Sequence, residues 1–148
     1  MPKQDLYNHI NAVQMLAPVS ISATQTAIEI DLKDCRSVVF FWLTGTEAGT
    51  LSGSLGWTLT VTHADDDGTG VAGDYANVAA ADVQGATPSS GVCFTLDDPA
   101  EDDTVYKLGY IGGKRFVKLL ITEVGTTTGM PTALLAVKSH LRDVPVVS

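Results

Sequence analysis

Residues 105–125, VYKLGYIGGKRFVKLLITEVG, decide the fold, because they hold the clearest pair of strand-like segments joined by a minimal turn. Gly112 and Gly113 can supply the positive φ angles that a two-residue primed turn requires, so the stretch predicts a β-hairpin. Regular pairing about this turn sets Lys107 directly opposite Lys118, and successive pairs alternate between two faces. The hairpin therefore predicts one face for the core and one for solvent or a partner.

The predicted core face of the hairpin is almost wholly apolar. It carries Tyr106, Leu108, Tyr110, Val117, Leu119 and Ile121. The other face carries Lys107 and Lys118, with Phe116 lying over the bare Gly109. Two lysines directly opposite each other are unfavourable by up to about 1 kcal/mol unless water or acidic groups separate their charges. This second face is either a solvated sheet face or an anion-facing interface.

The segment YIGGKRFVKLLIT, Tyr110–Thr122, resembles a segment of small virion proteins of tailed bacteriophages. The resemblance extends more loosely to APVSISAT at residues 17–24 and to LLAVKSHLRD at residues 134–143. It implies a structural role without catalytic residues or cofactors, such as a capsid decoration or cement protein that binds the major capsid protein and copies of itself. The implied location is the virion capsid, after synthesis in the host cytoplasm.

Two alternatives to a decoration protein are a tail or head-completion protein and a ligand-binding or glycan-binding β-sandwich module. A glycan-binding module is expected to expose aromatic side chains on a face or in a cleft. Trp42 and Trp57 both stand in apolar runs, which predicts that both are buried.

Length and composition bound the fold and the partners. With 148 residues, 45% of them hydrophobic, the chain suits one domain at residues 13–148, after a polar N-terminal arm at residues 1–12. The formal charge of −8 argues against nucleic-acid binding, which needs concentrated basic charge. The longest apolar run, Val38–Leu43, is too short to cross a membrane, so we expect a soluble protein. Cys35 and Cys93 are expected as free buried thiols, with one disulfide between them as the alternative.

Alternating apolar residues and turn signals predict about eight short strands. They lie at residues 13–21, 28–32, 37–43, 57–63, 92–96 and 133–141, and in the two arms of the hairpin. The run at 37–43 is apolar on both faces, which predicts a central strand, whereas residues 75–83 fit either a strand or a short helix. The apolar tail Val144–Val147 is expected to dock. The pattern as a whole predicts an all-β, antiparallel β-sandwich, with jelly-roll-like and immunoglobulin-like strand orders both open.

Candidate catalytic and metal sites are weak in this sequence. It contains no GxSxG, phosphate-loop, GxGxxG or HExxH motif, so we expect no enzyme. His63 alternates with apolar residues and is expected as a hydrogen-bonded histidine at the margin of the core. The segment Asp65–Gly70 has the closely spaced carboxylates of a calcium loop, but Ala76 stands where an EF-hand places its bidentate glutamate. We therefore expect a solvated turn there, with no metal and no cofactor.

The order of charges is the strongest asymmetry of the sequence. Between Arg36 and Lys107 there is no Lys or Arg but there are eleven carboxylates, and from Lys107 onward six basic residues face only Glu123 and Asp143. Acidic loops are expected either to screen the basic face within one domain, or to meet the basic hairpin of a neighbouring copy or of the capsid lattice. A head-to-tail contact of that kind can close into a ring such as a trimer. The candidate interface consists of Lys107, Lys114, Arg115, Phe116, Lys118, Asp97, Asp98, Glu101, Asp102 and Asp103.

Overall fold

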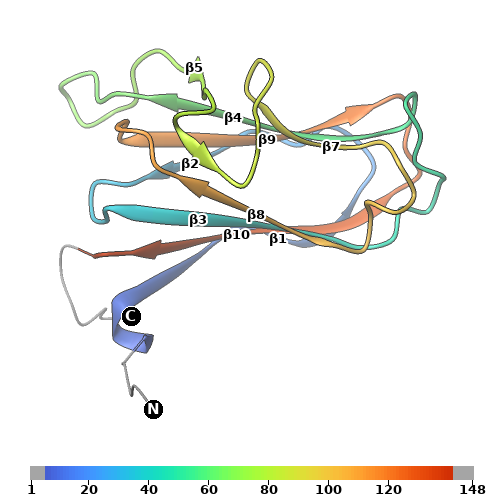
Figure 1. Cartoon of the computed structure of the whole chain (residues 1–148), viewed down its shortest axis with the longest axis horizontal. Coiled ribbons are helices and arrows are strands. Elements are labelled where there is room, and N and C mark those ends of the chain that lie inside the picture. The colour runs from blue at the N-terminus through green and yellow to red at the C-terminus, as the bar shows by residue number, and fades with distance from the viewer. Residues whose placement is uncertain (1–5, 142–148) are drawn as a thin grey trace.

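The computed structural model describes residues 6–141, which form a sandwich of two antiparallel β-sheets (Figure 1). The elements in chain order are the 3-10 helix η1 (Tyr7–His9) and the strands β1 (Ile10–Ile21), β2 (Ile28–Asp31), β3 (Ser37–Thr44), β4 (Gly56–Ala64), β5 (Ala76–Asn77), β6 (Val83–Gln84), β7 (Val92–Leu96), β8 (Val105–Tyr110), β9 (Phe116–Val124) and β10 (Met130–Ser139). No α-helix occurs in the described residues. The prediction of an all-β antiparallel sandwich is confirmed. The count is ten strands because residues 75–83, ambiguous in the sequence, contain β5 and lead into β6.

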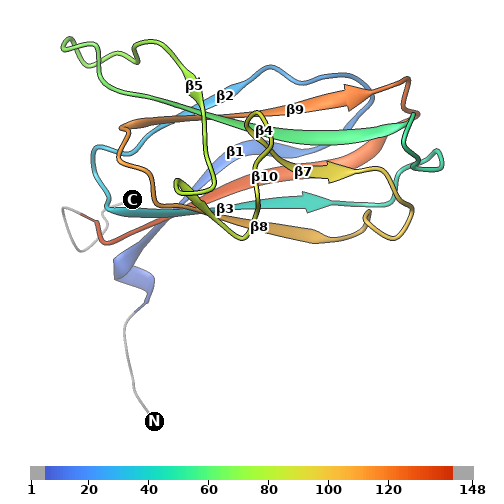
Figure 2. The same cartoon turned by 45° about the horizontal axis from the view of Figure 1, so that its top comes forward.

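The strand order is that of a jelly roll. Sheet A has the order β1-β10-β3-β8-β6, and sheet B has the order β2-β9-β4-β5, with β7 also paired to β4. Among the eight longer strands, every consecutive pair except β4 and β7 lies in different sheets, so the chain crosses repeatedly between the two layers (Figure 2). This alternation distinguishes the jelly roll from an immunoglobulin-like order, which the sequence left open.

The core fills the space between the two sheets. β3 lies between β10 and β8 in sheet A, as predicted for a central strand, and points Phe40 and Trp42 inward. β4 in sheet B points Trp57 and Leu59 toward them. Trp42 and Trp57 are 1% and 0% exposed, which confirms their predicted burial. Each buried indole N–H has an acceptor, as a buried polar group requires: Trp42 Nε1 donates to Thr132 Oγ1 at 2.7 Å.

Residues 105–125 form two strands but no hairpin. β8 pairs with β3 and β6 in sheet A, whereas β9 pairs with β2 and β4 in sheet B. Residues 111–115 therefore form an arch that carries the chain from one sheet to the other (Figure 1). The hairpin prediction is wrong because a turn signal between two amphipathic strands specifies a reversal of direction. It does not specify whether the strands then meet edge to edge or face to face.

The set of core residues predicted for this stretch is nevertheless correct. Five of the six are at most 4% exposed, and Tyr106 is half-buried: the five are Leu108, Tyr110, Val117, Leu119 and Ile121. A hairpin and an arch both turn the alternate residues of two strands toward the same core, so the period of two predicts burial in either case.

Glycine is needed in the arch for a reason other than the one the sequence suggested. Neither Gly112 nor Gly113 has a positive φ. A Cβ on Gly112 would lie 2.6 Å from Tyr110 Oη and 2.7 Å from its Cζ, whereas a Cβ on Gly113 would meet nothing within 4 Å. Gly112 therefore lets the arch cross close over a buried ring.

β1 begins at Ile10, inside the residues expected to form an arm, and pairs with β10 from there. Its register shifts between Gln14 and Leu16 and again between Leu16 and Val19. The alternation predicted for residues 13–21 therefore breaks down, and Val19 is 46% exposed. Residues 1–5 of the expected arm and the apolar tail at 144–147 lie outside the described residues.

Candidate interaction surfaces

The arch separates the two lysines that a hairpin would have placed side by side. Lys107 lies exposed on the outer face of sheet A, and Lys118 lies on the outer face of sheet B. The prediction that they share one basic face is therefore wrong. The predicted contact of Phe116 with Gly109 is wrong for the same reason: Phe116 is buried beside β4, and Gly109 pairs with Gln84.

Lys114 and Arg115, at the end of the arch, are neutralised by acidic residues of the same chain. Lys114 Nζ contacts Asp65. Arg115 donates two hydrogen bonds to Asp31, from Nε to Oδ1 at 2.9 Å and from Nη2 to Oδ2 at 2.8 Å. It also contacts Asp66. The hydrogen bonds from Arg115 lower the pKa of Asp31 despite the opposing effect of burial. Part of the acidic interval thus compensates the basic stretch within one domain.

Lys118 lies over an aromatic ring on the outer face of sheet B. Its Nζ lies 3.6 Å from the centroid of the Tyr75 ring, a cation–π contact. Glu29 is its cross-strand neighbour and accepts a hydrogen bond from the Tyr75 hydroxyl. Lys107 makes neither an ion pair nor a cation–π contact with any described residue.

The acidic residues 97–103 lie at the opposite end of the sandwich from Lys114 and Arg115 (Figure 2). The loop is braced by its own carboxylates: Glu101 Oε2 accepts from the backbone N–H of Asp97 at 2.8 Å and of Asp98 at 3.0 Å, and Asp98 Oδ1 accepts from Ala100 N at 2.9 Å. The candidate interface of the sequence analysis is therefore divided between two ends and two faces of the molecule.

Glu47, which the sequence analysis did not single out, is a buried carboxylate at the end of the sandwich that holds residues 97–103. Its side chain is 4% exposed and accepts from Trp57 Nε1 at 2.9 Å and from the backbone N–H of Thr128 at 3.0 Å and of Gly129 at 2.9 Å. Burial by itself raises the pKa of Glu47, but the donors of Trp57, Gly129, Thr128 and Gly49 outweigh it and hold that pKa below its ordinary value. The sequence gives no local signal for this site, since two of the donors, Thr128 and Gly129, lie 81 and 82 residues away.

His63 is a buried, hydrogen-bonded histidine, as predicted. Its Nδ1 lies 3.0 Å from Tyr110 Oη, and its Nε2 lies 4.0 Å from Asp82 Oδ2. Tyr110 Oη also accepts from Lys114 N at 3.1 Å. The group links β4 in sheet B to β8 in sheet A beneath the arch, and the His63 and Tyr110 side chains are both engaged in that link.

The Asp65–Gly70 segment is a turn closed by its own side chains. Asp66 Oδ1 accepts from the backbone N–H of Gly68 at 2.8 Å and of Gly70 at 2.9 Å, and these bonds lower the pKa of Asp66. Asp67 Oδ1 accepts from Thr69 N at 2.8 Å. Within residues 6–141 no group of three or more His, Cys, Asp or Glu side chains is arranged to hold a metal ion.

Both cysteines carry free thiols. Cys93 is buried, and burial raises the pKa of its thiol to about 11. Cys35 is half-buried in the loop between β2 and β3, and burial also raises its pKa. The prediction of free thiols is confirmed, although Cys35 is less buried than expected.

The outer face of sheet A is the most apolar surface of the sandwich. Facing outward on β3, β10 and β8 are Val39, Phe41, Leu43, Ala133, Leu135, Val137 and Val105, which we call the apolar face. Cross-strand pairing sets Leu135 beside Phe41 and Phe41 beside Lys107, so that Lys107 lies at its margin. Leu43 and Val105 are 39% and 59% exposed. The signal for this face was present in the sequence, as the run at 37–43 that is apolar on both sides.

The outer face of sheet B has the opposite character. Its threonines, which we call the threonine face, are Thr58, Thr60, Thr62, Thr95 and Thr122. Thr58 pairs with both Thr95 and Thr122. This is the ordinary pattern of an antiparallel sheet with one face in the core and one in water. The outer face of sheet A departs from this pattern, because its outward residues on β3 and β10 are mostly apolar.

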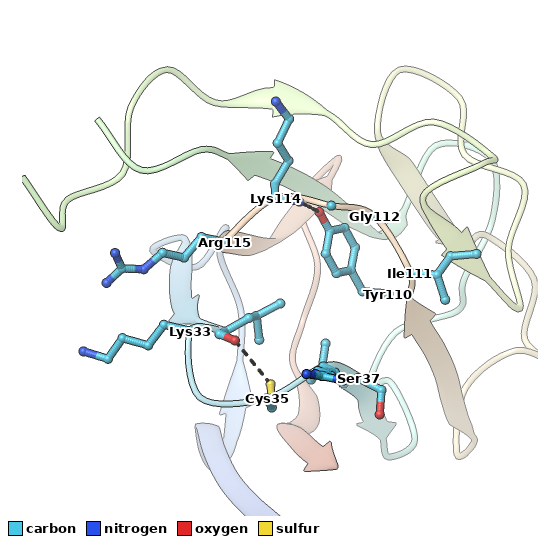
Figure 3. A pocket seen from close by; sticks show the side chains of 12 residues that line it. Lys33, Cys35, Ser37, Tyr110, Ile111, Gly112, Lys114 and Arg115 are labelled. Atoms are coloured by element: carbon cyan, nitrogen blue, oxygen red, sulfur yellow. Dashed lines mark hydrogen bonds between the residues drawn. The ribbon is translucent and has the colours of Figure 1, made fainter. Parts of the chain in front are cut away.

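A hollow lies at the end of the sandwich that holds the arch (Figure 3). Two cavities, of about 330 and 540 Å³, have Lys33, Cys35 and Arg36 in both linings, and we use the word hollow for the two together. The arch supplies one wall with Lys114 and Arg115, and the loop between β2 and β3 supplies the other. Sequence analysis placed Lys114 and Arg115 in an interface but did not bring Lys33 and Arg36 to them.

No helix among the described residues is long and apolar enough to cross a membrane.

No family model matches the sequence, and no curated protein matches it. Among solved structures, the chain is similar to a protein of Bacillus endospore appendages, which form a novel family of disulfide-linked pili, with 12% identity, a TM-score of 0.37, and coverage of 95% of this chain and 98% of that chain. It is also similar to VP2 of the infectious bursal disease virus subviral particle, with 14% identity and a TM-score of 0.39. That second similarity covers 92% of this chain but only 33% of the VP2 chain.

Proposed function

We propose that this chain is a structural protein of a bacteriophage particle, a decoration protein that attaches to the outer capsid surface through its apolar face. The observation that carries the proposal is that seven apolar side chains face outward on sheet A, five of them half-buried and two of them, Leu43 and Val105, exposed, with Lys107 as the charge at the margin. Such a face is costly in water and becomes favourable when a partner covers it. The resemblance of Tyr110–Thr122 to small virion proteins indicates the kind of partner.

The size of the apolar face favours a repetitive partner such as a capsid lattice. Three strands about 4.8 Å apart, with the face spanning five residues of about 3.3 Å along each strand, give a projected area of about 240 Å². Stable pairwise interfaces bury about 800 Å² on each partner. One copy is therefore expected to hold weakly by this face alone, and a lattice that presents the same site many times lets neighbouring copies reinforce one another.

The alternative of a glycan-binding module finds less support. It depended on an exposed tryptophan, and Trp42 and Trp57 are both buried with their indole N–H groups bonded inside the protein. The tail or head-completion alternative shares the apolar face with a decoration protein and differs only in where the copies sit on the particle.

The proposal is tested by locating the protein on purified virions by electron microscopy and by measuring its binding to capsids that lack it. Leu135→Lys places a charge at the centre of the apolar face and is expected to weaken capsid binding more than tenfold. Thr60→Lys makes the same kind of change on the threonine face and is expected to leave binding within twofold. Thermal melts of both variants check that they fold.

Absence of the protein from virions contradicts the proposal, as does unchanged capsid binding by folded Leu135→Lys. Location on the tail or the neck supports the head-completion or tail alternative instead.

A further inference from the structure

The hollow at the arch end presents positive charge that the described part of the chain leaves only partly neutralised. Four basic side chains line it, Lys33, Arg36, Lys114 and Arg115, and the one carboxylate in its lining is Asp34. Asp34 is engaged by Lys138, whose Nζ lies 2.8 Å from its Oδ1. The hollow therefore has a surplus of basic groups.

Two of the four basic groups make no close ion pair within residues 6–141. Lys114 and Arg115 contact Asp65, Asp31 and Asp66, as described above. Arg36 makes no ion pair with any residue between 6 and 141, and Lys33 Nζ approaches Asp31 only to 3.9 Å. A guanidinium and an ammonium group that line the same concave surface suit a ligand that carries carboxylates.

The opposite end of the same molecule carries such carboxylates. The four loops there, at residues 22–27, 45–55, 97–104 and 125–129, contain six acidic residues and no Lys or Arg. Five of the six lie in the loop 97–103, and the exposed Asp97 and Asp103 make no side-chain hydrogen bond with a described residue. This loop is already held in shape by Glu101 and Asp98, so little conformational entropy is lost when it binds.

We propose that the hollow binds the acidic loop 97–103 of a second copy of this chain. The two surfaces lie at opposite ends of the sandwich (Figure 1), so the contact is head-to-tail and repeats from copy to copy, closing into a ring or continuing as a filament. The apolar face runs between the two ends and stays free in this arrangement. The inference therefore does not depend on what that face binds.

The dependence of association on salt concentration distinguishes this contact from the electrostatic repulsion between whole molecules. The net charge of −8 opposes association at long range, most strongly at low salt. At about 0.15 M salt the Debye length is about 8 Å, so this repulsion is largely screened while ion pairs in contact persist. Association is thus expected to be strongest near 0.15 M salt and to weaken at about 1 M, where the Debye length falls to about 3 Å.

The experiment is a charge swap followed by sedimentation of the full chain over a range of protein concentrations. One variant is Arg36→Glu in the hollow. The other combines Asp97→Lys with Asp103→Asn in the loop, with Asn chosen because residue 103 has a φ of 49° that Asn tolerates. Each variant alone is expected to associate at least tenfold more weakly than the unchanged chain. An equimolar mixture is expected to recover association, because the charges at positions 36 and 97 are then opposite in sign at every contact between unlike copies.

Lys107→Glu is the matched control, since it changes net charge as much as Arg36→Glu but lies at neither end. It is expected to associate like the unchanged chain, and thermal melts confirm that each variant folds. The proposal is overturned if the unchanged chain stays monomeric at every salt concentration, if either folded variant associates as well as the unchanged chain, or if the mixture fails to recover.

Discussion

Carboxylate groups are stabilised by different kinds of partner at the two ends of the sandwich. At the arch end, the carboxylates of Asp31, Asp65 and Asp66 meet the cations of Lys114 and Arg115, mostly at the surface. At the opposite end no Lys or Arg is available in the loops, and the buried carboxylate of Glu47 is held by neutral N–H donors alone. The difference shows that a buried charge can be satisfied by hydrogen bonds without a counter-ion, and that the exposed carboxylates of that end then remain for a partner.

The largest expected effect concerns Glu47. Glu47→Gln replaces an acceptor of several N–H groups by an amide whose NH₂ must face one of them, so buried donors lose their partner. We expect a loss of about 3 kcal/mol in the free energy of unfolding at pH 7, measured by urea denaturation. Asp97→Asn, at an exposed carboxylate of the same end, is the control and is expected to change stability by less than about 0.5 kcal/mol. Equal stability of Glu47→Gln and the unchanged chain would show that the network does not hold this end.

The stabilities of the unchanged chain and of Glu47→Gln should respond differently to pH. Because the folded state holds the pKa of Glu47 below its ordinary value of 4.5, the carboxylate stabilises the fold fully above pH 4.5. This stabilisation is lost as the pH falls through the lower folded-state pKa. The difference in unfolding free energy between the unchanged chain and Glu47→Gln is therefore expected to shrink between pH 7 and pH 3, and a difference that grows on acidification would contradict this assignment.

An intermediate effect is expected at the arch end, where the structure distinguishes two adjacent glycines. Gly112→Ala forces a methyl group within 2.6–2.8 Å of the buried Tyr110 ring and is expected to cost about 2 kcal/mol. Gly113→Ala, with open space around its Cβ and no positive φ, is expected to stay within about 0.5 kcal/mol of the unchanged chain. Thermal melts of the two variants measure the difference. Similar losses in both would indicate a primed hairpin turn in place of the arch.

The smallest effects are expected from the ion pairs of the arch end. Lys114 and Asp65 have side chains 39% and 66% exposed, so Lys114→Ala is expected to cost less than about 0.5 kcal/mol. Arg115→Ala removes two hydrogen bonds to Asp31 and a guanidinium 4.7 Å from the Phe116 ring, so its loss of stability is expected to exceed that of Lys114→Ala. Urea denaturation at 0.1 and 1 M NaCl should show both differences shrinking with salt. A larger loss for Lys114→Ala than for Arg115→Ala would reverse the ranking that burial gives.

The sequence predicted some of the residue contacts in the candidate interface and missed others. Charge order correctly marked acidic and basic groups that belong together, since Asp65 and Asp66 do meet Lys114 and Arg115. It did not separate these carboxylates from those at 97–103, because nothing in a count of charges along the chain says at which end of the fold a loop emerges. Arg115 and Asp31 are 84 residues apart in sequence, and only the pairing of β2 with β9 brings them together.

The sequence by itself determined the strands, the all-β class and the composition of the core. These follow from apolar residues repeating with a period of two, from β-branched and aromatic runs such as 37–43 and from turn residues between them, all of which act over a few residues. The tertiary structure decided which strands pair, that residues 111–115 form an arch, and that Glu47 meets Thr128 and Gly129. The physical reason is that strand pairing is a competition among distant segments with similar local patterns. Its outcome depends on how two complete sheets bury their inner faces against each other, which no short stretch of the chain specifies.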